Sequence, residues 1–273
     1  MQSLIRLATA ATPSPRLKGW LVALAQRLGT PPSGTFRVRR GLQMELDPRQ
    51  YVDRMIFFHC FEDVSVRLFL QHLKTNDVVL DIGANIGYYA LVSAAAVGPG
   101  GRVIAFEPSP EVARKLRRNI LLNGLTNIEV RQVAVSDEAG ETALSWPEDN
   151  TAHASLKQGS ASWVSTAVRT ERLDDHLDEF GSVAAIKLDI EGAEYAAIKG
   201  AARLLAQRRP AVLMEVNGTA ASRFGRAKFD ALEQLLQLSP GRLVQATGTT
   251  LREVTLAQLK RDPEDSFNVL ICP

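Results

Sequence analysis

Short apolar segments alternate with amphipathic ones from Asp77 to the end of the chain. The apolar segments predict strands at residues 78–83, 102–108, 127–135, 185–190, 211–217, 242–248 and 267–272. The segments between them repeat apolar residues at helical spacing and predict helices at 85–97, 110–124, 170–180, 194–207, 229–238 and 256–261. Continuously apolar strands that alternate with helices are typical of a mostly parallel sheet covered on both faces. We therefore predict an α/β fold with a seven-stranded sheet, interrupted by an irregular polar region that runs through about Ser165.

The first 50 residues follow a different pattern. WLVALAQRL (20–28) has apolar residues at helical spacing, GTPPSG (29–34) reads as a turn, and the alternating residues around Gly41 predict a hairpin. Residues 51–73 look helical, with aromatic side chains that would pack onto the following domain. We therefore divide the chain into an N-terminal extension of short helix plus hairpin, residues 1–50, and a main domain, residues 51–273.

Composition and charge restrict the classes of function. Apolar residues make up 45% and charged residues 23% of the chain, which suits a soluble protein with a large core. The net charge of +2 does not favour a nucleic-acid partner, although residues 1–40 hold seven Arg and Lys and no acid. This basic extension is a candidate for peripheral membrane contact, but a helix packed on its own domain is commoner. Cys60 and Cys272 have no CxxC spacing and no apolar run reaches about 18 residues, which favours a cytoplasmic location.

The loop DIGANIG (81–87) follows the first predicted strand, at the edge where open parallel sheets bind ligands. Gly83 and Gly87 allow a tight turn and the close approach of a ligand, and Asn85 tolerates a left-handed backbone. The spacing is GxxxG rather than the GxGxxG of a dinucleotide loop, and Asp81 does not favour a pyrophosphate. S-adenosylmethionine carries an ammonium and a sulfonium but no phosphate, and it suits a loop that begins with an acid.

Other predicted strands also end in acidic residues. Glu107 ends the second strand, 20 residues past Gly87, where an acid reaches the ribose hydroxyls of an adenosine. Asp189 and Glu191 follow the fourth strand, and Glu215 lies at the end of the fifth. Carboxylates on adjacent strands raise one another's pKa, so one of them could serve as a general base. The same oxygens suit a divalent metal, but no histidine or further aspartate spacing supports one, and we predict no metal site.

Four motifs occur in order along the chain: LDIGANIGYYAL, AFEPSPEVARKLRRNILLNG, IKLDIEGAEYAAIKGA and PAVLMEV. They resemble the FkbM family of S-adenosylmethionine-dependent methyltransferases over about 58–217. The resemblance implies a class I methyltransferase (Rossmann-like) fold whose last strand, of seven, is antiparallel. It also implies O-methylation of a hydroxyl on a sugar, a glycan or a natural product.

The resemblance further implies a set of site residues. By position, the residues that would hold the cofactor are Glu62, Asp81, Gly83, Asn85, Gly87, Glu107, Pro108, Val135, Ser136 and Asp189. The glycine loop would hold the methionine part, Glu107 the ribose, and the segment with Val135 the adenine. An alcohol is a weak acid, so a base should lie within hydrogen-bond reach of the acceptor. Our candidates are Asp189, Glu191 and Glu215, in that order.

The residues leave rival functions open. A catalytically silent module that binds S-adenosylmethionine, with a basic N-terminal membrane or partner tether, would keep Asp81 and Glu107 but has no use for the other acids. N-methylation of nucleic-acid bases goes with Asp/Asn-Pro-Pro-aromatic after the fourth strand, where this chain has DIEG. A nicotinamide dehydrogenase is disfavoured by Asp81, although Tyr195 and Lys199 have the Tyr-x-x-x-Lys spacing. The polar stretch 146–164, with its two tryptophans, is a candidate substrate loop in which aromatic rings would stack on a sugar.

Overall fold

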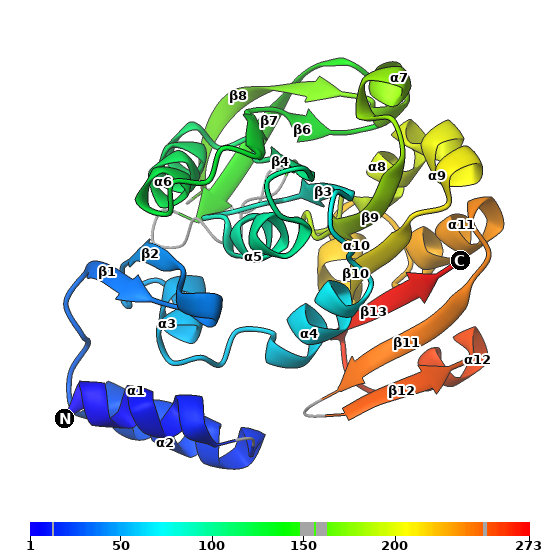
Figure 1. Cartoon of the computed structure of the whole chain (residues 1–273). Helices are drawn as coiled ribbons and strands as arrows, with labels where there is room; N and C mark the ends of the chain where they lie inside the picture. Colours follow the sequence, from blue (N-terminus) through cyan, green and yellow to red (C-terminus); the bar gives the residue numbers. More distant parts are fainter. Residues whose placement is uncertain (13, 148–155, 157–162, 248–249) are drawn as a thin grey trace.

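The computed structural model describes residues 1–12, 14–147, 156, 163–247 and 250–273. Within these ranges the central sheet has eight strands in the order β12-β11-β13-β10-β9-β3-β4-β5 (Figure 1). The strands are β3 (Val78–Ile82), β4 (Arg102–Phe106), β5 (Ile128–Arg131), β9 (Val183–Leu188), β10 (Ala211–Asn217), β11 (Arg242–Thr247), β12 (Thr250–Val254) and β13 (Ser266–Cys272). The predicted α/β class is confirmed.

The five strands from β5 to β10 are parallel, and β13 runs antiparallel between β10 and β11. The predicted antiparallel last strand is therefore confirmed. The predicted number of strands was wrong by one, because β12 adds an antiparallel edge strand next to β11. Most of β12 is exposed, so its sequence TLREV lacks the apolar run or alternation that identifies a buried strand.

Helices cover both faces of the sheet, as predicted. Side chains alternate along each strand, so Val79 belongs to the core under α4, α5 and α6, while Leu80 belongs to the core on the opposite face. That opposite face is covered by α8, α9, α11 and α12. The helices are α4 (Asp63–Gln71), α5 (Tyr88–Val97), α6 (Pro110–Leu122), α8 (Glu194–Gly200), α9 (Ala202–Arg208), α10 (Gly218–Arg223), α11 (Asp230–Leu238) and α12 (Leu256–Leu259).

A smaller sheet corrects two predictions. In the described residues it has three strands in the order β6-β8-β7, with bounds β6 (Ala134–Val135), β7 (Gly140–Pro147) and β8 (Trp163–Glu171). The predicted single strand at 127–135 is thus divided between two sheets. In the polar region expected to be irregular, the described residues 140–147 and 163–165 are paired strands. The helix predicted at 170–180 is instead the end of β8, a 3-10 turn η3 (Leu173–His176) and the short α7 (Leu177–Phe180). Thr170 and Glu171 are strand residues because they pair with β6, and this pairing outweighs their local propensity, while the acidic residues after them form the short helical turns.

The substrate loop predicted at 146–164 falls largely outside the described residues. Residues 148–155 and 157–162 are not described, so the predicted stacking by its tryptophans stays a prediction.

The N-terminal segment contains one more helix than predicted. Its elements are α1 (Gln2–Ala11), α2 (Pro15–Arg27), the strands β1 (Gly34–Arg37) and β2 (Gln43–Leu46) joined by η1 (Arg39–Gly41), and α3 (Tyr51–Phe57). The hairpin is confirmed by the antiparallel pairing of β1 with β2. The helical stretch predicted at 51–73 is interrupted at residues 58–62, between α3 and α4. Among the described residues, no helix has the length and apolar character needed to cross a membrane.

Candidate active site

Charged side chains at the carboxyl ends of neighbouring strands emerge on one face of the sheet. The residues two positions earlier in each strand belong to the core on the α5 side: Val79, Ala185 and Leu213. Because side chains alternate along a strand, Asp81, Lys187 and Glu215 point to that same side. Asp81 is paired with Lys187 in the register of β3 on β9, and β10 is the next strand. Asp189, two residues beyond Lys187, joins this group at the end of β9.

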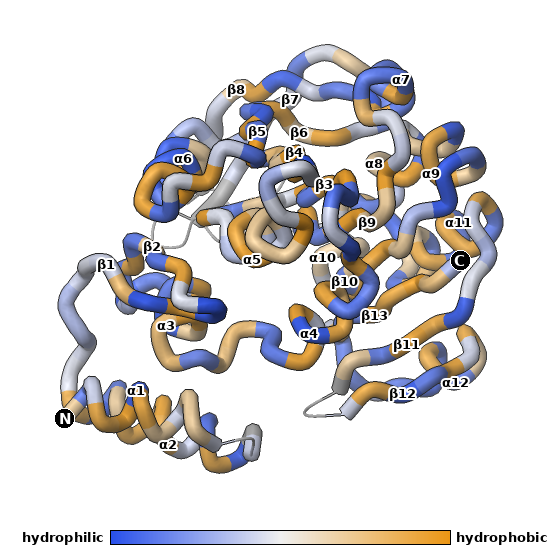
Figure 2. Tube along the Cα trace, viewed as in Figure 1, coloured by the Kyte–Doolittle hydropathy of each residue, from blue (hydrophilic) through white to orange (hydrophobic). Residues whose placement is uncertain are grey.

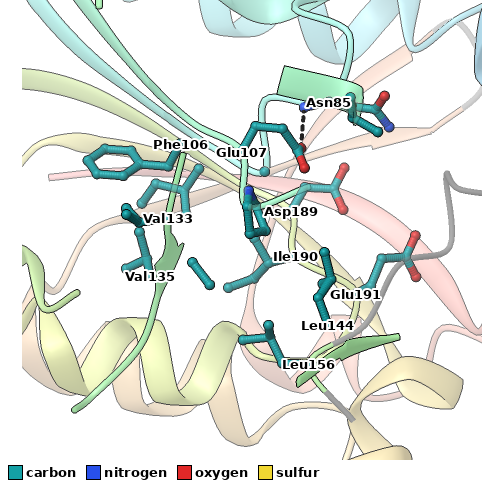
Figure 3. Close-up of a pocket in the computed structure, with 15 residues that line it drawn as sticks. Asn85, Phe106, Glu107, Val133, Val135, Leu144, Leu156, Asp189, Ile190 and Glu191 are labelled. Carbon is teal, nitrogen blue, oxygen red and sulfur yellow. Dashed lines mark hydrogen bonds between the residues drawn. The ribbon is translucent and has the colours of Figure 1, made fainter. Parts of the chain in front are cut away.

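Two adjoining pockets lie at this edge of the sheet. The first, which we call the apolar pocket, is shown in Figure 3 and is lined by Ile82, Gly83, Asn85, Phe106, Glu107, Pro108, Val112, Val133, Ala134, Val135, Leu144, Leu156, Asp189, Ile190 and Glu191. The second, the acidic pocket, is lined by Tyr51, Val52, Phe61, Glu62, Asp81, Gly83, Ala84, Asn85, Ile86, Tyr88, Tyr89, Lys187, Asp189, Glu191, Glu215 and Asn217. The pockets meet at the residues that line both: Gly83, Asn85, Asp189 and Glu191.

The glycine loop between β3 and α5 has the left-handed backbone that its sequence predicts. Gly83 has φ +84°, and a Cβ there would lie 1.9 Å from the backbone oxygen of Asp189. Asn85 follows with φ +50° and lines both pockets. Gly87 has φ +95°, but a Cβ there would lie 2.3 Å from Leu116 Cδ1 of α6. Gly83 therefore brings the backbone close to the pockets, whereas Gly87 serves the packing of α5 on α6.

Glu107 is held at the rim of the apolar pocket by the loops around it. Its Oε2 accepts a hydrogen bond from Asn85 N at 3.0 Å (Figure 3). Its Oε1 accepts one from Ser109 N at 2.9 Å. Burial raises the pKa of Glu107 to about 7, although the two backbone donors oppose that shift. Each oxygen keeps a second lone pair, so the side chain can still accept hydrogen bonds from a ligand.

Asp81 is a buried carboxyl group whose Oδ2 has no hydrogen-bond partner within the described parts of the chain. Burial raises its pKa to about 7, while the neighbouring Lys187 acts in the opposite direction. A buried polar atom without a partner costs free energy, and this one lines the acidic pocket. The arrangement suits a ligand that brings its own cationic hydrogen-bond donor.

Lys187 and Asp189 form an ion pair at the base of the acidic pocket. Lys187 is 2% exposed, and its Nζ donates to Asp189 Oδ2 at 2.9 Å. Burial alone would lower the pKa of Lys187, but the carboxylates of Asp189 and Glu62 raise it above its ordinary value. The lysine is therefore an ammonium ion at neutral pH, and it fixes the Asp189 side chain where the two pockets meet.

Two further carboxyl groups border the same pocket. Burial and then the charge of Asp189 raise the pKa of Glu215 to about 9, and its Oε1 accepts a hydrogen bond from Ser266 Oγ at 2.6 Å. Glu62 comes from the turn before α4, where its φ is +42°. Its Oε2 accepts a hydrogen bond from the Tyr89 hydroxyl at 2.7 Å, and burial raises its pKa. Glu215 is therefore protonated at neutral pH, whereas Lys187 is charged.

The structure brings most of the predicted site residues together. The predicted residues that line at least one pocket are Glu62, Asp81, Gly83, Asn85, Glu107, Pro108, Val135, Asp189, Glu191 and Glu215. Gly87 and Ser136 line neither. The Ser136 backbone N donates to Glu171 O at 3.0 Å, and its carbonyl packs against Gly200 at the end of α8. Which of the lining residues touch a ligand stays a prediction.

Sequence reasoning missed Lys187 and Tyr89. The sequence did contain a signal for Lys187. This lysine interrupts an apolar strand and stands two residues before Asp189, so the two side chains lie on the same face of the strand. Tyr89 gave no such signal, because it lies in a helix of apolar residues and its partner Glu62 comes from a distant turn.

Among the described residues, no group of three or more His, Cys, Asp or Glu side chains is arranged to hold a metal ion.

The family is established by comparison with known proteins. The family model named Methyltransferase FkbM domain matches residues 81–242, which is more than half of the 273-residue chain. The chain belongs to the FkbM methyltransferase family. It is therefore a methyltransferase, and its cofactor is S-adenosylmethionine. The match contains every predicted site residue except Glu62, which precedes it.

Three curated relatives of this FkbM-family chain align with it over different shares of their own lengths. Methyltransferase sdnD of Sordaria araneosa is 28% identical over 184 residues, which is 55% of this chain and 68% of that protein. The 31-O-demethyl-FK506 methyltransferase FkbM of Streptomyces tacrolimicus is 42% identical over 31% of this chain and 33% of its own. Hexuronic acid methyltransferase AglP of Haloferax volcanii is 30% identical over 51% of this chain and 56% of its own.

Among solved structures, the methyltransferase FkbM of Methylobacillus flagellatus KT is a neighbour of this FkbM-family chain. The two have a TM-score of 0.48 and 19% sequence identity, over 80% of this chain and 52% of that one.

Proposed function

We propose that this chain transfers the methyl group of S-adenosylmethionine to a neutral hydroxyl group on a sugar, a glycan or another hydroxyl-bearing small molecule. The observation that carries the proposal is the junction of the two pockets, where an ion-paired carboxylate, Asp189, lines both. The name of one relative, a 31-O-demethyl-FK506 methyltransferase, is consistent with a hydroxyl acceptor. The name of another, a hexuronic acid methyltransferase, is consistent with a sugar acceptor.

The apolar pocket and its rim suit the adenosine part of the cofactor. Val133, Val135 and Ile190 offer apolar surfaces to a purine, and Glu107 offers carboxylate oxygens to the two ribose hydroxyls. The unpartnered Oδ2 of Asp81 suits the cofactor's ammonium group, because a buried carboxylate is stabilised by a cation beside it. Gly83 lets the backbone approach both parts of the ligand.

The charges of the acidic pocket favour a neutral acceptor. Its lining includes five acidic residues, Glu62, Asp81, Asp189, Glu191 and Glu215, and one basic residue, Lys187. Lys187 is already paired with Asp189, so an incoming carboxylate would meet like charges without a free cation. A hydroxyl group avoids this repulsion, and it can donate a hydrogen bond to a carboxylate and accept one from a protonated carboxyl.

Asp189 is the group that we assign as the general base. The cofactor supplies an electrophilic methyl group, so the protein has to align the acceptor oxygen and take its proton. Lys187 donates to one oxygen of Asp189 and leaves the other for the acceptor hydroxyl. Glu215 is a poorer base at neutral pH because it is already protonated there, its pKa being raised to about 9.

The rival of a catalytically silent binding module is disfavoured. Such a module needs a cofactor pocket alone, whereas this chain has a second pocket with a buried ion pair beside it. A cofactor sensor gains nothing from charged groups buried at that depth, because each of them costs free energy to desolvate.

The proposal is tested by following the label of methyl-¹³C S-adenosylmethionine into a panel of acceptors. The panel contains neutral methyl pyranosides, methyl uronides and hydroxyl-bearing macrolides, and the products are identified by NMR and mass spectrometry. We expect the label in a methyl ether of a hydroxyl group, formed far more slowly when Asp189→Asn replaces the wild type. Label in a methyl ester or on an amine would contradict the proposal. Binding of S-adenosylhomocysteine without any methylated product would favour the silent module.

A further inference from the structure

Helix α1 leaves two large leucine side chains on its outer face, although its inner face is partly polar. Ile5 and Thr9 are buried on the inner face, where Arg6 Nε donates to Phe57 O at 2.8 Å. On the outer face the exposed side chains include Leu4, 70% exposed, and Leu7, 67% exposed. A helix on the surface of a globular domain normally turns its apolar stripe to the core.

Helix α2 extends this exposed apolar surface. It packs beside α1 in a helical pair at the edge of the molecule, and Figure 2 shows orange, hydrophobic stretches along both helices. Trp20 is 61% exposed and Leu17 is 45% exposed. We call the exposed side chains Met1, Leu4, Leu7, Leu17 and Trp20 the apolar face of the helical pair. Clustered apolar side chains of this size are a mark of an interaction surface.

The segment that carries this face is basic. Residues 1–40 contain seven Arg and Lys and no Asp or Glu. Three of these cations bind within the protein: Arg6 and Lys18 donate to backbone oxygens, and Arg39 pairs with Asp63. The remaining four side chains are exposed: Arg16, Arg27, Arg37 and Arg40. An apolar face with exposed cations and no acid in its segment is complementary to an anionic surface.

We propose that the helical pair docks on the surface of an anionic lipid bilayer, with its apolar face at the level of the acyl chains and the exposed arginines of α2, Arg16 and Arg27, at the headgroups. Short amphipathic helices with Trp and Leu on one side and basic residues beside them lie in the bilayer interface in this way. A juxtaposed basic residue strengthens such binding through the negative potential of the lipid surface. The tryptophan ring suits the interface because one edge is apolar and its N–H is polar.

The docking is tested with the full chain and two kinds of vesicle, one of phosphatidylcholine and one with phosphatidylserine added. Binding is measured by co-sedimentation and, in a Trp146→Phe/Trp163→Phe background, by the emission of Trp20, which is then the one tryptophan left of the three in the sequence. We expect at least tenfold stronger partition onto the anionic vesicles, a blue shift of Trp20 emission, and weaker binding in high salt.

The matched variants separate the apolar face from general surface effects. Leu4→Glu/Leu7→Glu should reduce partition at least tenfold, whereas Leu121→Glu, at a 78% exposed leucine of α6, should leave it unchanged. Circular dichroism shows whether each variant keeps its fold. Equal binding by all three proteins, or no binding to anionic vesicles, would overturn the proposal. So would lipid-independent dimerisation in analytical ultracentrifugation that Leu4→Glu/Leu7→Glu abolishes, because the apolar face would then bind a second copy.

Discussion

Replacing Asp189 with asparagine is expected to lower the rate of methyl transfer by about 10²- to 10⁴-fold, the usual contribution of a positioned general base. The affinity for S-adenosylhomocysteine should stay within about fivefold of the wild-type value, because asparagine keeps the size of the side chain and an oxygen that can accept from Lys187 Nζ. The rate is measured in single turnover with the acceptor that gives a methyl ether, and the affinity by calorimetry.

Glu191→Gln is the matched control for this experiment. Glu191 also lines both pockets, so its replacement removes a negative charge from the same junction. We expect a rate within about tenfold of wild type, since removing a charge near the site without removing the base has a smaller effect than losing proton transfer. If Glu191→Gln gave the large loss and Asp189→Asn did not, the base would be Glu191 and our assignment would be wrong. Thermal unfolding of both variants checks that the buried Lys187 is still accommodated.

Replacing Asp81 with asparagine should weaken the binding of S-adenosylhomocysteine by about 10- to 100-fold. A buried hydrogen bond to a charged group contributes about 1.5–3 kcal/mol, and each 1.4 kcal/mol corresponds to a factor of ten. The stability of the free protein should not fall, because Asp81 Oδ2 has no partner in the described residues and burial already disfavours its charge. Calorimetry and thermal unfolding measure the two effects separately.

The binding should also depend on pH in a way that Asp81 controls. Its pKa is about 7 in the free protein, so below that pH a proton has to leave before the carboxylate can pair with a cation. Affinity should therefore rise by about tenfold or more between pH 5.5 and 7.5, with protons released on binding. Asp81→Asn should flatten part of this dependence and leave the part due to Glu107, whose pKa is also about 7.

Glu194→Gln provides the control for a buried acid that has no part in the ligand site. Burial raises the pKa of Glu194 to about 7 as well, but its Oε1 accepts from the backbone N of Ile190 and it lines neither pocket. The variant should bind S-adenosylhomocysteine with nearly wild-type affinity. An equal loss in Glu194→Gln and Asp81→Asn would contradict the assignment of Asp81 to the cofactor's ammonium group.

The sequence was most informative where chemistry follows strand periodicity. Asp81, Asp189 and Glu215 stand at the ends of apolar strands, and neighbouring parallel strands bring their carboxyl ends to one edge. Their assembly around one pocket therefore followed from the alternation of strands and helices before any contact was known. The same periodicity places Lys187 on the face of Asp81. It was not predicted as a site residue because a lysine in a strand is usually exposed at an edge rather than buried against an acid.

Elements that depend on distant partners were predicted less well. Thr170 and Glu171 end β8 because they pair with β6, which precedes β7 in the chain, although the acidic sequence that follows them favours a helix locally. Glu62 enters the acidic pocket from the break between α3 and α4, a break that continuous helical spacing over residues 51–73 conceals. The outward orientation of Leu4 and Leu7 likewise depends on what α1 packs against, and apolar spacing alone does not tell which side of a helix meets the protein.

The most direct test of the account is a crystal structure of the chain with S-adenosylhomocysteine. We expect the adenine among Val133, Val135 and Ile190, the ribose hydroxyls on Glu107, and the amino group within hydrogen-bond distance of Asp81 Oδ2. The sulfur atom should then face the acidic pocket beside Asp189, where an acceptor hydroxyl can be aligned with it. A sulfur atom directed away from Asp189, or an amino group that makes no contact with Asp81, would contradict the proposed site.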